Sequence, residues 1–190
     1  MFVTFCICCF RNMDGVQMNN TELKLFIKHS NLIENIESES QIQYSIKAWK
    51  YICKKKELTL KDILKVHKII MTPLWPEIAG KIRTVGVRVG SRICPQFEEV
   101  PGLLDKWIYN YGKGVTVVTH DISGKEELLG DMEKACKCAH ISFESIHPFR
   151  DGNGRTGRLL WLWHRFKLGL TFAYVDYNER YDYYNWFAQI

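Results

Sequence analysis

The segment HPFRDGNGRTGR, residues 147–158, decides how this chain folds. On both sides of it, over residues 125–146 and again as far as Gly169, apolar side chains recur three and four residues apart. That spacing is typical of amphipathic helices. Pro148 disfavours helical geometry at His147, so the first helix should end there. The segment is therefore predicted to hold the loop between two long helices together with the first turn of the second helix.

The second half of this segment is predicted to bind an anion. Gly152, Asn153 and Gly154 lead into the second helix, which should begin at Asn153 or Gly154, and backbone N–H groups at a helix start lack partners within the helix. Arg155 and Arg158 lie three residues apart and so share one side of the first turn. Their positive charge opposes the helix dipole unless an anion lies opposite. The pattern therefore indicates a polyphosphate ligand.

The same glycines fit the dinucleotide fingerprint GxGxxG, but that fingerprint must follow a buried strand, and helical spacing precedes it here. Asp151 comes directly before the glycines and is placed to hold Mg²⁺, which often binds one or two carboxylates together with substrate phosphates. A helix N-cap is a compatible second role for this side chain. His147 lies across the turn, where a neutral imidazole can take a proton from an attacking hydroxyl.

The rest of the chain is predicted to be mainly α-helical, with a single β-hairpin. Residues 81–94 are rich in β-branched side chains that nearly alternate, and Gly90-Ser91 is a turn signal between two strands. Further helices are predicted over residues 21–38 with Asn20 or Thr21 near the cap, over 40–55, from Thr59 to before Pro73, from Pro101 onward, and over the aromatic tract 178–190.

The composition indicates one globular domain. The chain has 190 residues, is 46% hydrophobic and has no Pro/Gly/Ser-rich linker. Residues 20–190 are predicted to form the domain, and residues 1–19 a poorly ordered extension. The net charge of +5 is mild, and the cluster at residues 54–56 is interpreted as a solvated helix end, so no nucleic-acid partner is expected. No apolar run is long enough to span a membrane. Seven irregularly spaced cysteines favour reduced thiols in a cytoplasmic protein.

The segment resembles the signature of the Fic family, His-x-Phe-x-Asp/Glu-Gly-Asn-Gly-Arg-x-x-Arg, and every specified position is met. The resemblance covers roughly residues 20–187 and implies a Fic-type helical domain with the hairpin beside the active-site loop. Three further stretches are similar to the Fic core: Ala79-Gly80-x-x-Arg83, Pro101, and His140-x-x-Phe143-Glu144-x-Ile146.

This resemblance implies a protein adenylyltransferase that moves AMP from ATP onto a Tyr, Thr or Ser hydroxyl of a target protein. The hairpin, about residues 85–93, would be a flap that registers the target by strand addition. Doc-type relatives, which phosphorylate, carry a lysine-containing variant, so Gly154-Arg155 favours nucleotidyl transfer. The implied roles are His147 as base, Phe149 as the anchor of the loop, Asp151 as the Mg²⁺ ligand, Gly152, Asn153, Gly154 and Arg155 as ligands of the α- and β-phosphates, and Arg158 as ligand of the γ-phosphate.

A second motif, Ser30-x-x-x-Glu34-Asn35, resembles the inhibitory motif of the family. In that motif the glutamate pairs with the second arginine of the signature and blocks placement of the γ-phosphate. The resemblance therefore implies a pair between Glu34 and Arg158. Such a pair would let ATP bind in an unproductive pose, so the transferase would be auto-inhibited.

Several alternatives stay open at this point. Removal of AMP from a modified protein is one, because some family members use the inhibitory glutamate to orient water. A non-catalytic nucleotide-binding or antitoxin-partner module is another, although His147 and Asp151 are not needed for binding alone. A nucleotide other than ATP is also compatible with the sequence. The target would be read by the flap and nearby surface or through a homo-oligomer.

Overall fold

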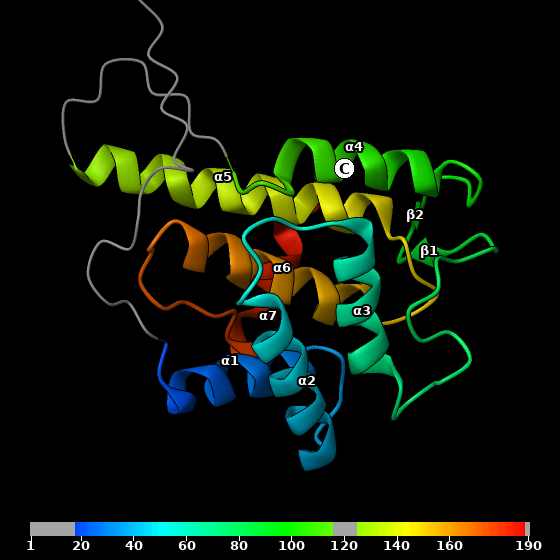
Figure 1. The fold of residues 1–190 in the computed structure, drawn as a ribbon, viewed down its shortest axis with the longest axis horizontal. Helices are drawn as coiled ribbons and strands as arrows, with labels where there is room; N and C mark the ends of the chain where they lie inside the picture. The colour runs from blue at the N-terminus through cyan, green and yellow to red at the C-terminus, as the bar shows by residue number, and fades with distance from the viewer. Residues whose placement is uncertain (1–17, 116–124, 189–190) are drawn as a thin grey trace, which may run out of the picture.

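The computed structural model describes residues 18–115 and 125–188, and over these it is helical with one hairpin (Figure 1). The predicted fold class, mainly α with one hairpin, is confirmed. The elements in chain order are α1 (Asn20–Leu32), α2 (Glu39–Ile52), α3 (Leu60–Met71), β1 (Arg88–Val89), β2 (Arg92–Ile93), α4 (Val100–Tyr111), α5 (Lys125–Ile146), α6 (Asn153–Lys167), the 3₁₀ helix η2 (Tyr177–Glu179) and α7 (Arg180–Asn185).

The two helices joined by the loop at residues 147–152, α5 and α6, form the centre of the domain. The bounds of α5 and the start of α6 agree with the sequence prediction. Helix α6 packs against α5 on one side and against α1 and α3 on the other (Figure 1). Almost every residue of α6 between Asn153 and Arg165 is buried, which is typical of a central helix. The loop is thus held at the end of a packed pair of helices.

Helix α1 is shorter than the predicted helix over residues 21–38. It begins after Asn19, which forms a capping box with Glu22, so the cap lies one residue before Asn20. It ends at Leu32 because Asn35 adopts a left-handed conformation with φ of 56°. The Ile36 N–H then donates to the Asn31 carbonyl (3.0 Å), as in a Schellman turn. This turn leaves the residues after α1 free to face α6.

The hairpin is also shorter than the alternating pattern over residues 81–94 suggests. Only Arg88 and Val89 pair with Ile93 and Arg92, around the predicted Gly90-Ser91 turn. An isolated two-stranded hairpin gains little stability by itself, and these strands have no third strand to pair with among the described residues. In Figure 1 the hairpin lies at the end of the domain where α5 finishes and α6 begins.

Two other predicted helices have different limits. The helix predicted over 40–55 ends at Ile52, where the Lys55 N–H donates to the Ile52 carbonyl (2.9 Å) in a tighter turn. The aromatic tract forms η2 and α7 and then continues in three-residue turns from Trp186 to Ala188. Residues 189–190 of that tract lie outside the described part.

Thr59 caps α3 as predicted, with a capping box to Asp62. The predicted N-terminal extension, residues 1–19, lies outside the described residues except for Met18 and Asn19, so that assignment stays a prediction. None of the described helices combines the length and the hydropathy that a bilayer crossing requires.

Candidate active site

His147 lies directly after α5 in a strained backbone conformation. Its φ is 49°, in the left-handed region, and its N–H still donates to the Phe143 carbonyl (3.2 Å). A non-glycine residue with this φ is uncommon and needs support from its surroundings. Pro148 explains why the helix ends at this point, since a proline disfavours helical geometry at the residue before it. The chain therefore turns sharply at the residue that is predicted to be the base.

Arg83 and Arg92 hold this turn in place. Arg83 Nε donates to the His147 carbonyl (2.8 Å), and one of its Nη atoms donates to the Pro95 carbonyl (2.6 Å). Arg92, on β2, donates to the carbonyls of Glu144 and Ser145 at 3.0 Å each. These carbonyls at the end of α5 have no partners within the helix, and positive charge is favourable there. The hairpin and the turn at His147 are thereby tied together.

The middle of the loop is anchored to the core through Phe149 and Asn153. Phe149 is fully buried, as the sequence predicts. The Asn153 side chain accepts from the Phe149 N–H (2.8 Å) and donates to the Phe149 carbonyl (2.9 Å). Asn153 therefore contributes to a phosphate site only through its backbone N–H at the start of α6, because its side chain faces inward.

His67 on α3 contacts the loop through a hydrogen bond and a ring stack. The Gly80 N–H donates to His67 Nδ1 (2.9 Å), which leaves the Nε2–H to donate to the Asp151 carbonyl (2.9 Å). The ring stacks on Phe149 with centroids 3.7 Å apart and planes 4° apart. Burial lowers the pKa of His67 to about 4, so the imidazole stays neutral near pH 7. The contact of His67 with the loop could not be predicted from the sequence, because α3 and the loop come together only in the folded chain.

Asp151 is exposed on the loop, and the Gly152 that follows it is buried. The Asp151 side chain is 51% exposed, and its Oδ1 accepts from the Gly152 N–H (2.6 Å). Gly152 has a φ of 78°, and a Cβ atom there would lie 2.6 Å from Met71 Sδ, so only glycine fits. The carboxylate is thus exposed beside the start of α6.

Arg155 is buried next to this carboxylate with most of its donors unused. Its side chain is 2% exposed, and Nη2 lies 4.0 Å from Asp151 Oδ1 and 3.3 Å from Met71 Sδ. Its Nε and Nη1 have no hydrogen-bond partner among the described residues. A buried guanidinium without acceptors costs several kcal/mol, on the order of 1–3 for each donor. A phosphate group is the kind of ligand that removes this cost.

Arg158 has the opposite environment, because its donors are occupied. Nε donates to the Ser30 hydroxyl (2.8 Å), and Nη2 donates to the Ser30 carbonyl (2.8 Å) and to Glu34 Oε1 (2.6 Å). Nη1 donates to the Tyr183 hydroxyl at 3.3 Å. The pair between Glu34 and Arg158 that the resemblance implies is present, and the hydrogen bonds of Ser30 to the same guanidinium were not predicted.

The Glu34 carboxylate also reaches the start of α6. A Cβ atom at Gly154 would collide with Glu34 Oε1, so this oxygen lies against the backbone there. The N-cap residue of α6 is Gly152, which has no side chain that could accept from the N–H groups of the first turn. Burial raises the pKa of Glu34, but the charge and hydrogen bond of Arg158, with the charge of Arg155, outweigh it and lower the pKa overall. An ionised carboxylate therefore occupies part of the anion site.

His147 is neutral in this environment. Burial lowers its pKa to about 4, and the positive charge of Arg92 adds to this effect, while the Glu144 carbonyl opposes it. Its Nδ1 lies 3.8 Å from Glu144 Oε2, and the side chain is 18% exposed. Above about pH 5 the imidazole can therefore accept a proton.

The donors of the site suit a metal that is bound mainly by phosphate. The described residues contain no group of three or more His, Cys, Asp or Glu side chains that could hold a metal ion by itself. A single exposed carboxylate such as Asp151 can hold Mg²⁺ only together with other ligands, such as substrate phosphates. The site can thus hold a polyphosphate, a cation and a hydroxyl facing a neutral histidine.

Replacing Asn153 with alanine should lower the free energy of unfolding by about 2 kcal/mol, because the Phe149 N–H and carbonyl would be left buried without partners. Urea unfolding of the variant measures the loss. Asn178→Ala is the control, because Asn178 is exposed on η2. Equal stability of the two variants would show that Asn153 does not support the loop.

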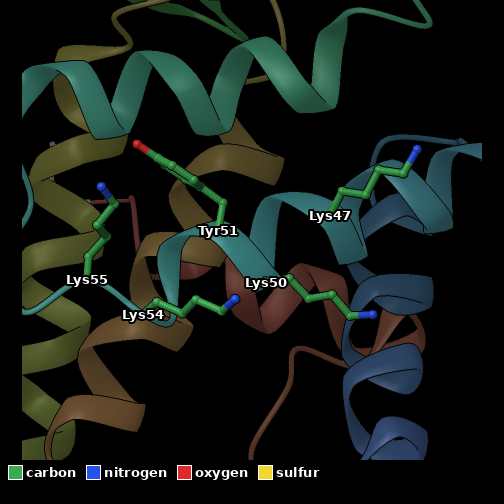
Figure 2. Close-up of a pocket in the computed structure, with 5 residues that line it drawn as sticks. All are labelled: Lys47, Lys50, Tyr51, Lys54 and Lys55. Atoms are coloured by element: carbon green, nitrogen blue, oxygen red, sulfur yellow. The ribbon is translucent and has the colours of Figure 1, made fainter.

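A basic hollow lies elsewhere on the molecule, along α2. Figure 2 shows the lysines and the tyrosine that line it, Lys47, Lys50, Tyr51, Lys54 and Lys55. Lys55 pairs with Asp62 on α3 (2.8 Å), and the Tyr51 hydroxyl donates to the same carboxylate (2.6 Å). None of these residues belongs to the loop, so the hollow is separate from the candidate site.

Comparison with known proteins gives matches over most of the chain. A sequence profile of the Fic/DOC family matches residues 57–164. The protein adenylyltransferase Fic of Nematostella vectensis is 30% identical over 138 residues, which are 73% of this chain and 30% of that protein. Protein adenylyltransferase fic-1 of Caenorhabditis elegans is 32% identical over 108 residues, 55% of this chain and 18% of that protein. This chain thus spans under a third of the length of these relatives.

Solved structures show the same fold. Fic-1 (residues 134–508) from C. elegans has a TM-score of 0.68 and 23% identity, covering 90% of this chain and 58% of that one. A Fic-domain-containing signalling protein from Bacteroides thetaiotaomicron has a TM-score of 0.64 and 18% identity, covering 86% of this chain and 69% of that one.

Proposed function

This chain belongs to the Fic/DOC family, and from that premise we propose that it transfers AMP from ATP to a hydroxyl group of a protein. The observation that carries the proposal is the set of unpaired donors on Arg155, buried beside Asp151 at the start of α6. A triphosphate supplies acceptors for these donors and for the N–H groups of the helix start.

The proposed reaction uses each residue of the loop for one task. Arg155 and the backbone from Gly152 to Gly154 hold the α- and β-phosphates, and Arg158 takes the γ-phosphate once Glu34 has left it. Asp151 would hold Mg²⁺ together with phosphate oxygens, and the ion would neutralise charge on the phosphates.

His147 takes the proton of the attacking hydroxyl. The hydroxyl oxygen forms a bond to the α-phosphorus, the bond to the β-phosphate oxygen breaks, and pyrophosphate leaves. Most of the rate enhancement would come from positioning and charge neutralisation, with proton transfer contributing on the order of 10²–10⁴-fold.

The hairpin is proposed to hold the target segment. Its strands are two residues long, and their outward side chains, Val89 and Ile93, are 43% and 70% exposed. Exposed strand edges can pair with an extended peptide. Because Arg92 ties β2 to the last carbonyls of α5, a bound segment would lie close to His147.

Removal of AMP from a protein is a second candidate, and the place of Glu34 favours it. One carboxylate oxygen of Glu34 holds Arg158, and the side chain is 30% exposed beside the anion site. A carboxylate there could orient a water molecule toward a bound phosphodiester. Incubation with an AMP-modified protein separates the two reactions, since only the hydrolase releases AMP from it.

The position of the label in ATP tests the transfer itself. A Glu34→Gly variant incubated with Mg²⁺ and ATP labelled at the α-phosphate should retain label on protein, and the same ATP labelled at the γ-phosphate should leave none. Retention of the γ-label instead would indicate phosphorylation and would overturn the proposal. Retention of neither label would also contradict it.

A further inference from the structure

Glu144 lies buried one turn before His147, and its carboxyl group faces the imidazole. The residue is 8% exposed, in the contact between α5 and α6. Its Oε2 lies 3.8 Å from His147 Nδ1. Its Oε1 has no hydrogen-bond partner among the described residues, and a Cβ atom at Gly157 would collide with it. Gly157 thus leaves space for a carboxyl group where α5 and α6 meet.

The proposed reaction assigns no role to Glu144. Burial of an unpaired carboxyl group is costly, so a stabilising role alone does not account for it. Burial raises the pKa of Glu144 to about 8; the Arg158 charge opposes this and the Glu34 charge adds to it. The group is therefore mostly protonated near pH 7 while Glu34 is on Arg158. The charged and titratable groups around it are His140 and His147 beside it on the chain, Arg158 on α6, Arg92 on β2, Cys94 after β2, Tyr183 on α7, and Glu34 after α1.

We propose that Glu144 is a positioning residue that, when ionised, orients the imidazole of His147 and stabilises the imidazolium formed during transfer. The inference rests on the proposed function. Because Nδ1 faces Glu144, Nε2 is the nitrogen that receives the hydroxyl proton. The imidazole then carries one positive charge, and the carboxylate lies next to its other nitrogen. At this short distance opposite charges attract strongly in a buried site.

The kinetic consequence is a rate that depends on the ionisation of Glu144. In the Glu34→Gly background, where one negative neighbour is removed, Glu144 should ionise at a lower pH than in the parent protein. The rate ratio of this protein to its Glu144→Gln derivative should be near 1 at about pH 5 and should rise to about tenfold or more by about pH 9. The amide introduced by Glu144→Gln is neutral like the protonated acid, so the variant should fold normally.

A purely structural role for Glu144 predicts a different result. Loss of packing would lower the rate by the same factor at every pH. Glu57→Gln is the matched control, because it removes the same charge from an exposed position far along the chain from the loop. A constant ratio for Glu144→Gln, or a rising ratio for Glu57→Gln, would overturn the proposal.

Nuclear magnetic resonance of the His147 ring tests the contact without any transfer. In the parent protein the ¹³Cε1 resonance of His147 should shift in a step near pH 8, as Glu144 loses its proton. The step should vanish in Glu144→Gln and remain in Glu57→Gln. A His147 resonance without this step, or with the same step in Glu144→Gln, would overturn the proposal. Because the resonance needs no nucleotide, an inactive transferase with the step intact would contradict only the proposed function.

Discussion

Replacing Glu34 with glycine is expected to raise the rate of AMP transfer between about 5-fold and 150-fold, the usual range for coupling between an inhibitory contact and a ligand. Glu34 Oε1 lies 2.6 Å from Arg158 Nη2 and against Gly154 at the start of α6. In the proposed reaction the γ-phosphate binds the same arginine. Removal of the carboxylate therefore frees the donors on which productive ATP binding depends. The rate is measured as incorporation of α-labelled ATP into protein.

Glu37→Gly is the matched control for this experiment. Glu37 lies three residues further along the same connection, is exposed, and has no contact with Arg158 among the described residues. Its replacement adds the same glycine flexibility and removes the same charge. Equal rates for the Glu34 and Glu37 variants would show that the Glu34 carboxylate does not restrain the site.

The inhibitory contact between Glu34 and Arg158 should not depend on pH near neutrality. The pKa of Glu34 lies below its ordinary value, so the carboxylate stays charged throughout the neutral range. A carboxylate with a lowered pKa contributes stability above its unfolded-state pKa and loses it only as the pH falls through the folded-state value. Protonation of Glu34 therefore does not release Arg158 near neutral pH.

The second large effect is expected for His147→Ala, made in the Glu34→Gly background. Loss of the base should lower the transfer rate on the order of 10²–10⁴-fold. The proposed phosphate ligands are on α6 and in the glycine turn, so affinity for ATP should change little. Rates from α-labelled ATP and affinities from calorimetry separate the two effects. A transfer rate within about a factor of two of that of the Glu34→Gly protein would show that His147 is not the base.

The local features of the site could be predicted from the sequence because neighbouring residues determine them. Periodic apolar residues give α5 its bounds, Pro148 ends it, and the glycines with Arg155 identify the anion site. The pair between Glu34 and Arg158 was predicted from a motif and not from physics, since 124 residues separate the two.

The supporting residues could not be predicted in the same way. Arg83 and His67 bind backbone carbonyls of the loop, and Arg92 binds those at the end of α5. Such contacts leave no spacing pattern in the sequence. The end of α1 depends on one asparagine in a left-handed conformation, which a helical pattern up to residue 38 conceals. Glu144 belongs to a stretch that is similar to the Fic core, but its burial beside His147 depends on the packing of α5 against α6.

Intact-protein mass spectrometry after incubation with Mg²⁺ and ATP tests the central claim most directly. Three proteins are compared: the parent, Glu34→Gly, and Glu34→Gly with His147→Ala. An auto-inhibited transferase with His147 as its base should show little or no adduct on the parent, the mass of one or more AMP groups on the first variant, and none on the second. An unmodified Glu34→Gly protein, or an AMP adduct that persists without His147, would contradict this claim.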